Sequence, residues 1–135
     1  MVMSSRSSYS RGMRVLIIDD SASFLRAARA FVLTQPGIDE VAVAPSGESG
    51  LDLLARYRPD LVLVDLAMPG IDGLETTRRL KARPAAPAVF VLSLVTGPTY
   101  ADAAAAAGAD GFISKPDLPT VFPAVAAGLR GVHVR

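Results

Sequence analysis

The sequence predicts an α/β fold in which a doubly wound, five-stranded parallel sheet carries helices on both faces. Short apolar runs rich in valine, isoleucine and leucine occupy residues 15–18, 61–64 and 89–92. Continuous runs of this kind are typical of strands that are buried on both faces of a parallel sheet. Segments with apolar residues at helical spacing lie between the runs, so a β-α unit is repeated five times. Because crossovers between parallel strands are right-handed, this series places helices on both faces.

The expected elements alternate along the whole chain. The expected strands are residues 14–19, 40–44, 61–65, 88–93 and 110–114. The expected helices are about residues 21–34, 47–57, 72–81, 99–107 and 120–130. The first helix is predicted from an inner stripe at helical spacing, formed by Phe24, Leu25, Ala28, Phe31 and Val32. Pro36 and Gly37 end that helix, and Ser46 is placed to cap the second one.

Local signals also mark the later helices. Asp72 is the expected cap of the third helix, and Pro84 and Pro87 break the chain after it. Gly108 is placed just past the end of the alanine-rich fourth helix. Pro123 is expected in the first turn of the last helix, where a proline removes no intrahelical hydrogen bond.

Composition limits the functions that this chain can have. The chain has 135 residues, which indicates one domain, and its net charge of +1 argues against a large nucleic-acid-binding face. It contains no cysteine, which excludes disulfides and thiolate metal sites and fits a cytoplasmic location. No apolar run approaches the roughly 18–20 residues that a membrane-spanning helix needs. We expect a flexible leader at residues 1–12, a folded domain at 13–131 and a tail at 132–135.

Polar residues stand at the ends of four of the predicted strands. They are Asp19 and Asp20 after the first, Asp65 after the third, Ser93 after the fourth and Lys115 after the fifth. Because the reactive groups of an open parallel sheet lie beyond the carboxyl ends of its strands, these side chains are expected at one edge. Three carboxylates, a hydroxyl and an ammonium there fit a Mg²⁺ site beside an aspartate that accepts a phosphoryl group.

These residues together resemble the receiver domain of bacterial two-component response regulators. The resemblance covers about residues 13–131 and rests on six features in order: Asp19-Asp20, Asp65, Met68-Pro69, Asp72-Gly73, Ser93 and Lys115-Pro116. It implies a flavodoxin-like sheet with strand order 2-1-3-4-5. It also implies a switch that a histidine kinase controls by phosphorylation, rather than an enzyme acting on a separate substrate.

The resemblance assigns a role to each residue of the predicted site. Asp65 is the phosphoacceptor, with Asp20 as a direct Mg²⁺ ligand and Asp19 as a ligand through water. The backbone carbonyl of Ala67 completes the metal shell. Lys115 pairs with Asp65 before phosphorylation and holds a phosphoryl oxygen afterwards. The resemblance also makes the peptide bond before Pro116 cis.

Two further residues belong to the implied switch. Ser93 is the hydroxyl that moves toward the phosphoryl group. Phe112 occupies the position of an aromatic switch residue, and core packing is an equally open interpretation for it. Leu94, Val95 and Ala67 flank the site where the family often has small or polar residues. We therefore hypothesise an apolar rim that slows hydrolysis of the acyl phosphate.

The implied partners are proteins. They are a sensor histidine kinase or phosphotransfer protein, an output domain or downstream protein, and a second copy bound through the fourth helix, fifth strand and fifth helix. No direct binding to nucleic acid or to a membrane is expected.

Two alternatives remain at this point. A pseudo-receiver would have the same fold and act without phosphate; the complete set of acceptor, hydroxyl and ammonium argues against it. A phosphohydrolase of the haloacid dehalogenase type needs a second acid two residues after its nucleophile. Ser21 and Ala22 stand at the positions two residues after Asp19 and Asp20, which argues against that enzyme.

Overall fold

The computed structural model describes residues 12–134, so nearly all of the predicted leader lies outside the described residues. The strands are β1 (Met13–Ile18), β2 (Ile38–Ala44), β3 (Leu61–Asp65), β4 (Ala88–Ser93) and β5 (Gly111–Ser114). The helices are α1 (Ala22–Leu33), α2 (Gly47–Tyr57), α3 (Gly73–Lys81), α4 (Pro98–Ala106) and α5 (Leu118–Val134), with the 3₁₀ turn η2 (Lys115–Asp117) directly before α5. The predicted alternation is confirmed, and most ends agree to within two residues.

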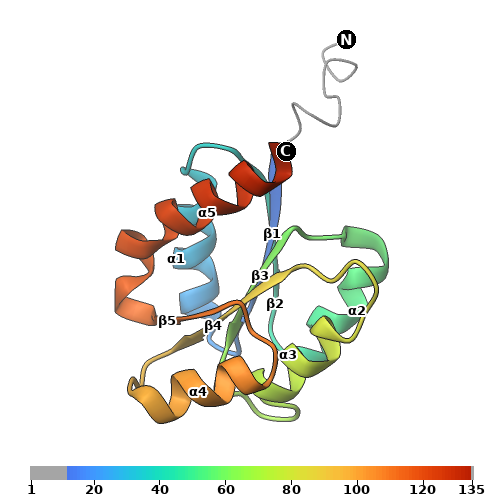
Figure 1. Ribbon diagram of the computed structural model, residues 1–135, viewed down its shortest axis with the longest axis vertical. Coiled ribbons are helices and arrows are strands. Elements are labelled where there is room, and N and C mark those ends of the chain that lie inside the picture. The colour runs from blue at the N-terminus through green and yellow to red at the C-terminus, as the bar shows by residue number, and fades with distance from the viewer. Residues whose placement is uncertain (1–11, 135) are drawn as a thin grey trace.

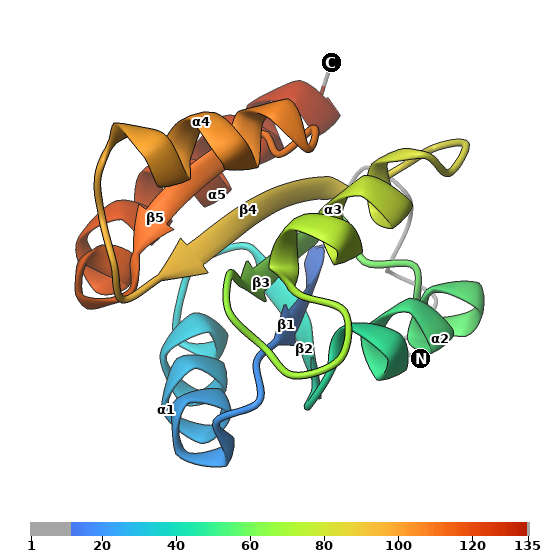
Figure 2. The ribbon, with the colours of Figure 1, turned by 90° about the horizontal axis from the view of Figure 1, so that it is seen from below.

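All four strand pairings are parallel, and the strand order is β2-β1-β3-β4-β5. Helices α1 and α5 cover one face of the sheet, while α2, α3 and α4 cover the other (Figure 1). The view from below shows the same two layers around the central strands (Figure 2). The predicted doubly wound fold and its 2-1-3-4-5 order are therefore confirmed.

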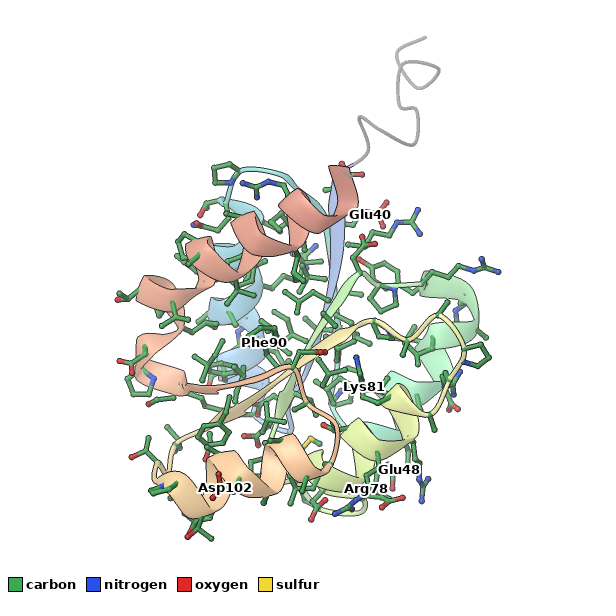
Figure 3. The ribbon with its side chains drawn as sticks, in the orientation of Figure 1. Glu40, Glu48, Arg78, Lys81, Phe90 and Asp102 are labelled. Atoms are coloured by element: carbon green, nitrogen blue, oxygen red, sulfur yellow. The ribbon has the colours of Figure 1, made fainter. Side chains whose placement is uncertain are left out.

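The strand residues alternate between two apolar cores. Val15 and Ile17 of β1 face the α1–α5 side, whereas Leu16 and Ile18 face the α2–α4 side, and all four are fully buried. Phe90 of β4, labelled in Figure 3, packs on the α1–α5 side. Full burial of a leucine or valine side chain contributes about 1.5–3 kcal/mol, so these continuous runs hold the sheet centre in place.

The predicted helix caps form as expected. Ser46 and Ser49 make a reciprocal capping box at the start of α2, and Asp72 accepts the Glu75 amide at the start of α3. Such caps stabilise a helix start by about 1 kcal/mol each. The cap on Asp72 matters for the site because it fixes the end of the loop that follows Asp65.

Two expectations about the last crossover were wrong. Helix α5 begins at Leu118 rather than near 120, so Pro123 lies inside it and not in its first turn. Pro119, at the second position of α5, is compatible with a helix start because the first amides need no partner. No peptide bond among the described residues is cis, so the bond before Pro116 is trans. It belongs to the 3₁₀ turn, which the Leu118 amide closes onto the Lys115 carbonyl.

Within residues 12–134, no helix has both the length and the apolar character needed to cross a membrane.

Candidate functional site

The predicted strand-end residues meet at one edge of the sheet. Asp19, Asp20 and Asp65 each offer a carboxylate oxygen, and these oxygens lie within 4.8 Å of one another. Asp19 is fully buried, Asp65 is 6% exposed and Asp20 is exposed to solvent. Asp20 is therefore the carboxylate that an ion arriving from solvent meets first.

Lys115 reaches this cluster from the end of β5. Its ammonium lies 2.7 Å from Asp19 Oδ2 and 3.1 Å from Asp65 Oδ1, and its side chain is only 10% exposed. The predicted pair with Asp65 is present. The contact with Asp19 is shorter and was not predicted. One ammonium thus bridges two of the three carboxylates.

Burial and the neighbouring charges of the site shift the pKa values of Asp65 and Lys115. Burial raises the pKa of Asp65, and the neighbouring Asp19 carboxylate raises it further, against the opposing effect of Lys115. Burial by itself lowers the pKa of Lys115, but the Asp19 and Asp65 carboxylates outweigh this effect and raise it overall. The ammonium therefore stays charged, while the acceptor carboxylate is destabilised by its surroundings.

The turn between β1 and α1 holds Asp19 in place. Asp19 Oδ1 accepts a hydrogen bond from the Ser21 amide at 2.8 Å. Ser21 is the N-cap of α1, and its hydroxyl oxygen accepts from the Phe24 amide at 3.2 Å. The ring centroid of Phe24 lies 4.5 Å from Lys115 Nζ. The sequence indicated Phe24 only as a core residue, and nothing in its helical spacing pointed to the lysine.

The start of α3 packs against the backbone of Asp65 and Leu66. The Gly73 amide donates to the Leu66 carbonyl at 2.9 Å, and the Leu66 amide donates to the Leu92 carbonyl at 2.8 Å. A Cβ on Gly73 would overlap the carbonyl oxygen of Asp65 and lie 2.8 Å from Leu66 Cα. Only glycine fits this contact, which explains why Gly73 follows the capping residue Asp72.

Ser93 and Phe112 occupy the two predicted switch positions. Ser93 is 2% exposed at the end of β4, and its Oγ accepts the Val95 amide at 3.0 Å. Phe112 pairs with Val91 in the β4–β5 register and packs, partly buried, on the α2–α4 side. Ala67 is exposed in the loop after Asp65.

The β4–α4 loop carries the exposed apolar residues of this edge. Leu94 is 75% exposed and Val95 is 48% exposed. The Leu94 side chain is thus mostly in solvent.

Comparison with known proteins identifies the family of this chain. The family model described as the response regulator receiver domain matches residues 15–125. The nitrate/nitrite response regulator protein NarP of Escherichia coli is 34% identical over 122 residues, which cover 90% of this chain and 57% of NarP. The transcriptional regulatory protein DegU of Brevibacillus brevis is 32% identical over 76% of this chain and 44% of its own length. The chain therefore spans about half the length of these two relatives.

Solved structures agree with this likeness. A two-component response regulator of the LuxR family from Aurantimonas sp. superposes with a TM-score of 0.80 at 29% identity, covering 89% of this chain and 86% of that one. The receiver domain of a signal transduction histidine kinase from Syntrophus aciditrophicus has a TM-score of 0.78 at 26% identity, with coverages of 90% and 92%. From its sequence, its fold and the residues gathered at its sheet edge, the chain belongs to the response regulator receiver domain family of two-component systems.

Proposed function

We propose that Asp65 is the residue of this receiver domain that accepts a phosphoryl group from a histidine kinase or a phosphotransfer protein. The observation that carries the proposal is the position of Asp65, which has a carboxylate oxygen within 4.8 Å of oxygens of Asp19 and Asp20 and a contact of 3.1 Å to the Lys115 ammonium. A carboxylate is a known acceptor of phosphoryl groups. In the transfer, an Asp65 oxygen forms a bond to phosphorus, the donor's phosphorus–nitrogen bond breaks, and that electron pair stays on the imidazole nitrogen.

The donor set fits a hard divalent cation. Three carboxylates carry three negative charges and Lys115 neutralises only one, so a divalent ion would balance the site. We infer that Asp20 and Asp65 bind Mg²⁺ directly, that Asp19 binds it through water and that the Ala67 carbonyl completes the shell. When bound, Mg²⁺ would neutralise phosphoryl oxygens in the transition state.

The chain's own residues then hold the added charge. Lys115 would move from its carboxylate partners to a phosphoryl oxygen, because the new group brings more charge than Asp65 alone. The Ser93 hydroxyl, now an acceptor for Val95, would turn to donate to the same group. These two movements would shift the β4–α4 loop and the face formed by α4, β5 and α5, where Phe112 would respond.

The partners follow from this cycle. We propose a sensor kinase or phosphotransfer protein as donor, and an output domain or downstream protein as recipient of the signal. We also propose that phosphorylation acts by forming a homodimer through α4, β5 and α5. The chemistry is limited to Mg²⁺-assisted transfer onto Asp65 and its hydrolysis, in a protein that we expect in the cytoplasm.

Intact-mass spectrometry after incubation with acetyl phosphate tests the proposal. We expect one phosphoryl addition that requires Mg²⁺ and is absent in Asp65→Asn. Asp102→Asn changes an exposed aspartate on α4 that is not part of the cluster; it is the matched control and should be phosphorylated like the wild type. A wild-type protein that gains no mass from acetyl phosphate or from a cognate phosphorylated kinase would contradict the assignment.

A further inference from the structure

The Lys115 ammonium has three close neighbours, two carboxylates and one aromatic ring. Asp19 and Asp65 supply the two ion pairs, at 2.7 and 3.1 Å. The third neighbour is the Phe24 ring, whose centroid is 4.5 Å from Nζ. A cation within about 6 Å of an aromatic centroid is attracted by the negative face of the ring, and the attraction is stronger where water is excluded. With a side chain 10% exposed, Lys115 meets that condition.

Phe24 and Asp19 are positioned by the same turn. Asp19 accepts from the Ser21 amide, and Ser21 in turn caps the Phe24 amide. The ring and the carboxylate that flank Lys115 are therefore linked through three hydrogen-bonded residues of one helix start. This linkage fixes the backbone of Phe24 relative to the Asp19 carboxylate.

The ring, unlike the carboxylates, holds the ammonium without occupying an oxygen that could bind a metal. Asp19 and Asp65 hold the ammonium and also belong to the carboxylate cluster that could hold a metal, so the two cations draw on the same two side chains. The Phe24 ring attracts the ammonium without using any of these oxygens. It also carries no net charge, so it repels an incoming phosphoryl group far less than a carboxylate does.

From these contacts we propose that Phe24 is a positioning residue for Lys115, which keeps the ammonium at the site when the carboxylates engage the metal and the phosphoryl group. The inference rests on the proposed transfer to Asp65 and adds a residue to it. Its functional effect is expected on affinity for a tetrahedral anion rather than on affinity for the metal.

Binding of beryllium trifluoride, a phosphoryl analogue, at saturating Mg²⁺ tests the proposal. Phe24→Leu removes the aromatic face and keeps an apolar side chain, so we expect affinity for the analogue to fall about three- to tenfold. Phe24→Tyr keeps the ring and should stay within about twofold of the wild type. Affinity for Mg²⁺ alone should be unchanged in both variants.

Phe31→Leu is the matched control. Phe31 lies on the same core-facing side of α1, but its ring packs against Phe122, at 6.2 Å between centroids, and not against the lysine. We expect Phe31→Leu to lower stability without weakening binding of the analogue. Equal affinities for the wild type and Phe24→Leu, or equal losses in Phe24→Leu and Phe31→Leu, would overturn the positioning role.

A double-mutant cycle in metal-free buffer tests the contact without any phosphoryl chemistry. Phe24→Leu is compared in the wild type and in Lys115→Met by urea unfolding. We expect it to reduce the unfolding free energy more when Lys115 is present, by an amount equal to about two- to fivefold in the equilibrium constant. The same reduction in both backgrounds would show that the ring only fills the core, and would overturn the inference. If the wild type binds no analogue, the proposed function fails, and this cycle alone decides on the contact.

Discussion

The Lys115 ammonium and the Asp19 carboxylate form a buried ion pair with 2.7 Å between Nζ and Oδ2, although the two residues are 96 positions apart in the chain. Asp19 has no exposed surface, so Lys115 is the cation that compensates it. The same lysine faces the proposed acceptor. Its contribution to stability and its proposed contribution to phosphoryl binding therefore come from one position.

Replacing this lysine is expected to destabilise the protein strongly. Lys115→Met leaves a buried carboxylate without its cation, so the free energy of unfolding should fall by about 3 kcal/mol at neutral pH. Lys81→Met is the control, because Lys81 (Figure 3) pairs with Asp110 at 2.9 Å but has a side chain 25% exposed. That pair should contribute about 1 kcal/mol or less. Urea unfolding of both variants measures the difference, and equal losses would contradict the special role of the buried pair.

Asp65→Asn is expected to stabilise the metal-free protein at neutral pH. The folded state raises the pKa of Asp65 above its ordinary value of 3.8, chiefly through burial and then through Asp19. Protonation of Asp65 thus favours folding; this contribution is complete below the ordinary pKa and is lost as the pH rises through the folded-state pKa. The stability of the wild type relative to Asp65→Asn should fall over that range. Urea unfolding from pH 3 to 8 in a chelator measures the difference, and a constant difference would contradict the shift.

Mg²⁺ should stabilise the folded protein through the acidic cluster. At a concentration ten times the dissociation constant, binding to the native state adds about 1.4 kcal/mol. Asp20→Asn should lose most of this gain, because Asp20 is the exposed carboxylate of the cluster. Asp102→Asn on α4 should retain it. Thermal unfolding with Mg²⁺ and with a chelator gives the comparison, and an equal gain in all three proteins would place the ion elsewhere.

Substitutions in the β4–α4 loop should shorten the lifetime of the acyl phosphate. Leu94→Ala and Val95→Glu each remove an apolar group from the rim of the site, so water reaches the phosphoryl group more readily and hydrolysis accelerates severalfold. Because these side chains are 75% and 48% exposed, their replacement should leave stability almost unchanged. The decay of phosphorylated protein after removal of the donor measures the rate. An unchanged rate in both variants would end the rim hypothesis.

Tyr57, at the opposite end of the sheet, is expected to ionise late. Burial raises the pKa of its phenol to about 12, and Glu40 (Figure 3) adds to the effect. The stability that Tyr57 contributes is complete below its ordinary pKa of 10.0 and is lost as the pH rises through about 12. Absorbance titration of tyrosinate should show a late step that disappears in Tyr57→Phe. A titration curve identical in the two proteins would contradict this environment.

The sequence predicted the fold and most of the site for a physical reason. Parallel strands bring their carboxyl ends to one edge, so residues that follow buried runs must meet there whatever their separation in the chain. Asp19, Asp65 and Lys115 were found in this way, and the structure brings them together.

The parts that were not predicted depend on side-chain directions and on chain ends. Helical spacing shows that Phe24 faces inward, but not that its ring meets an ammonium from β5. The start of α5 was placed too late because Pro116 and Pro119 are typical of loops as well as of the first turn of a helix.

The contact between Gly73 and the backbone of Asp65 has a mechanical consequence. On one side the acceptor is braced by α3, where no space remains even for a methyl group. On the other side, the β4–α4 loop ends at Gly97, which has a φ of +133° and no atom within 4 Å of where a Cβ would lie. The backbone of Asp65 is thus closely packed against the start of α3, whereas the end of the β4–α4 loop has open space beside it. We therefore expect added charge at Asp65 to displace the start of α4 rather than the start of α3.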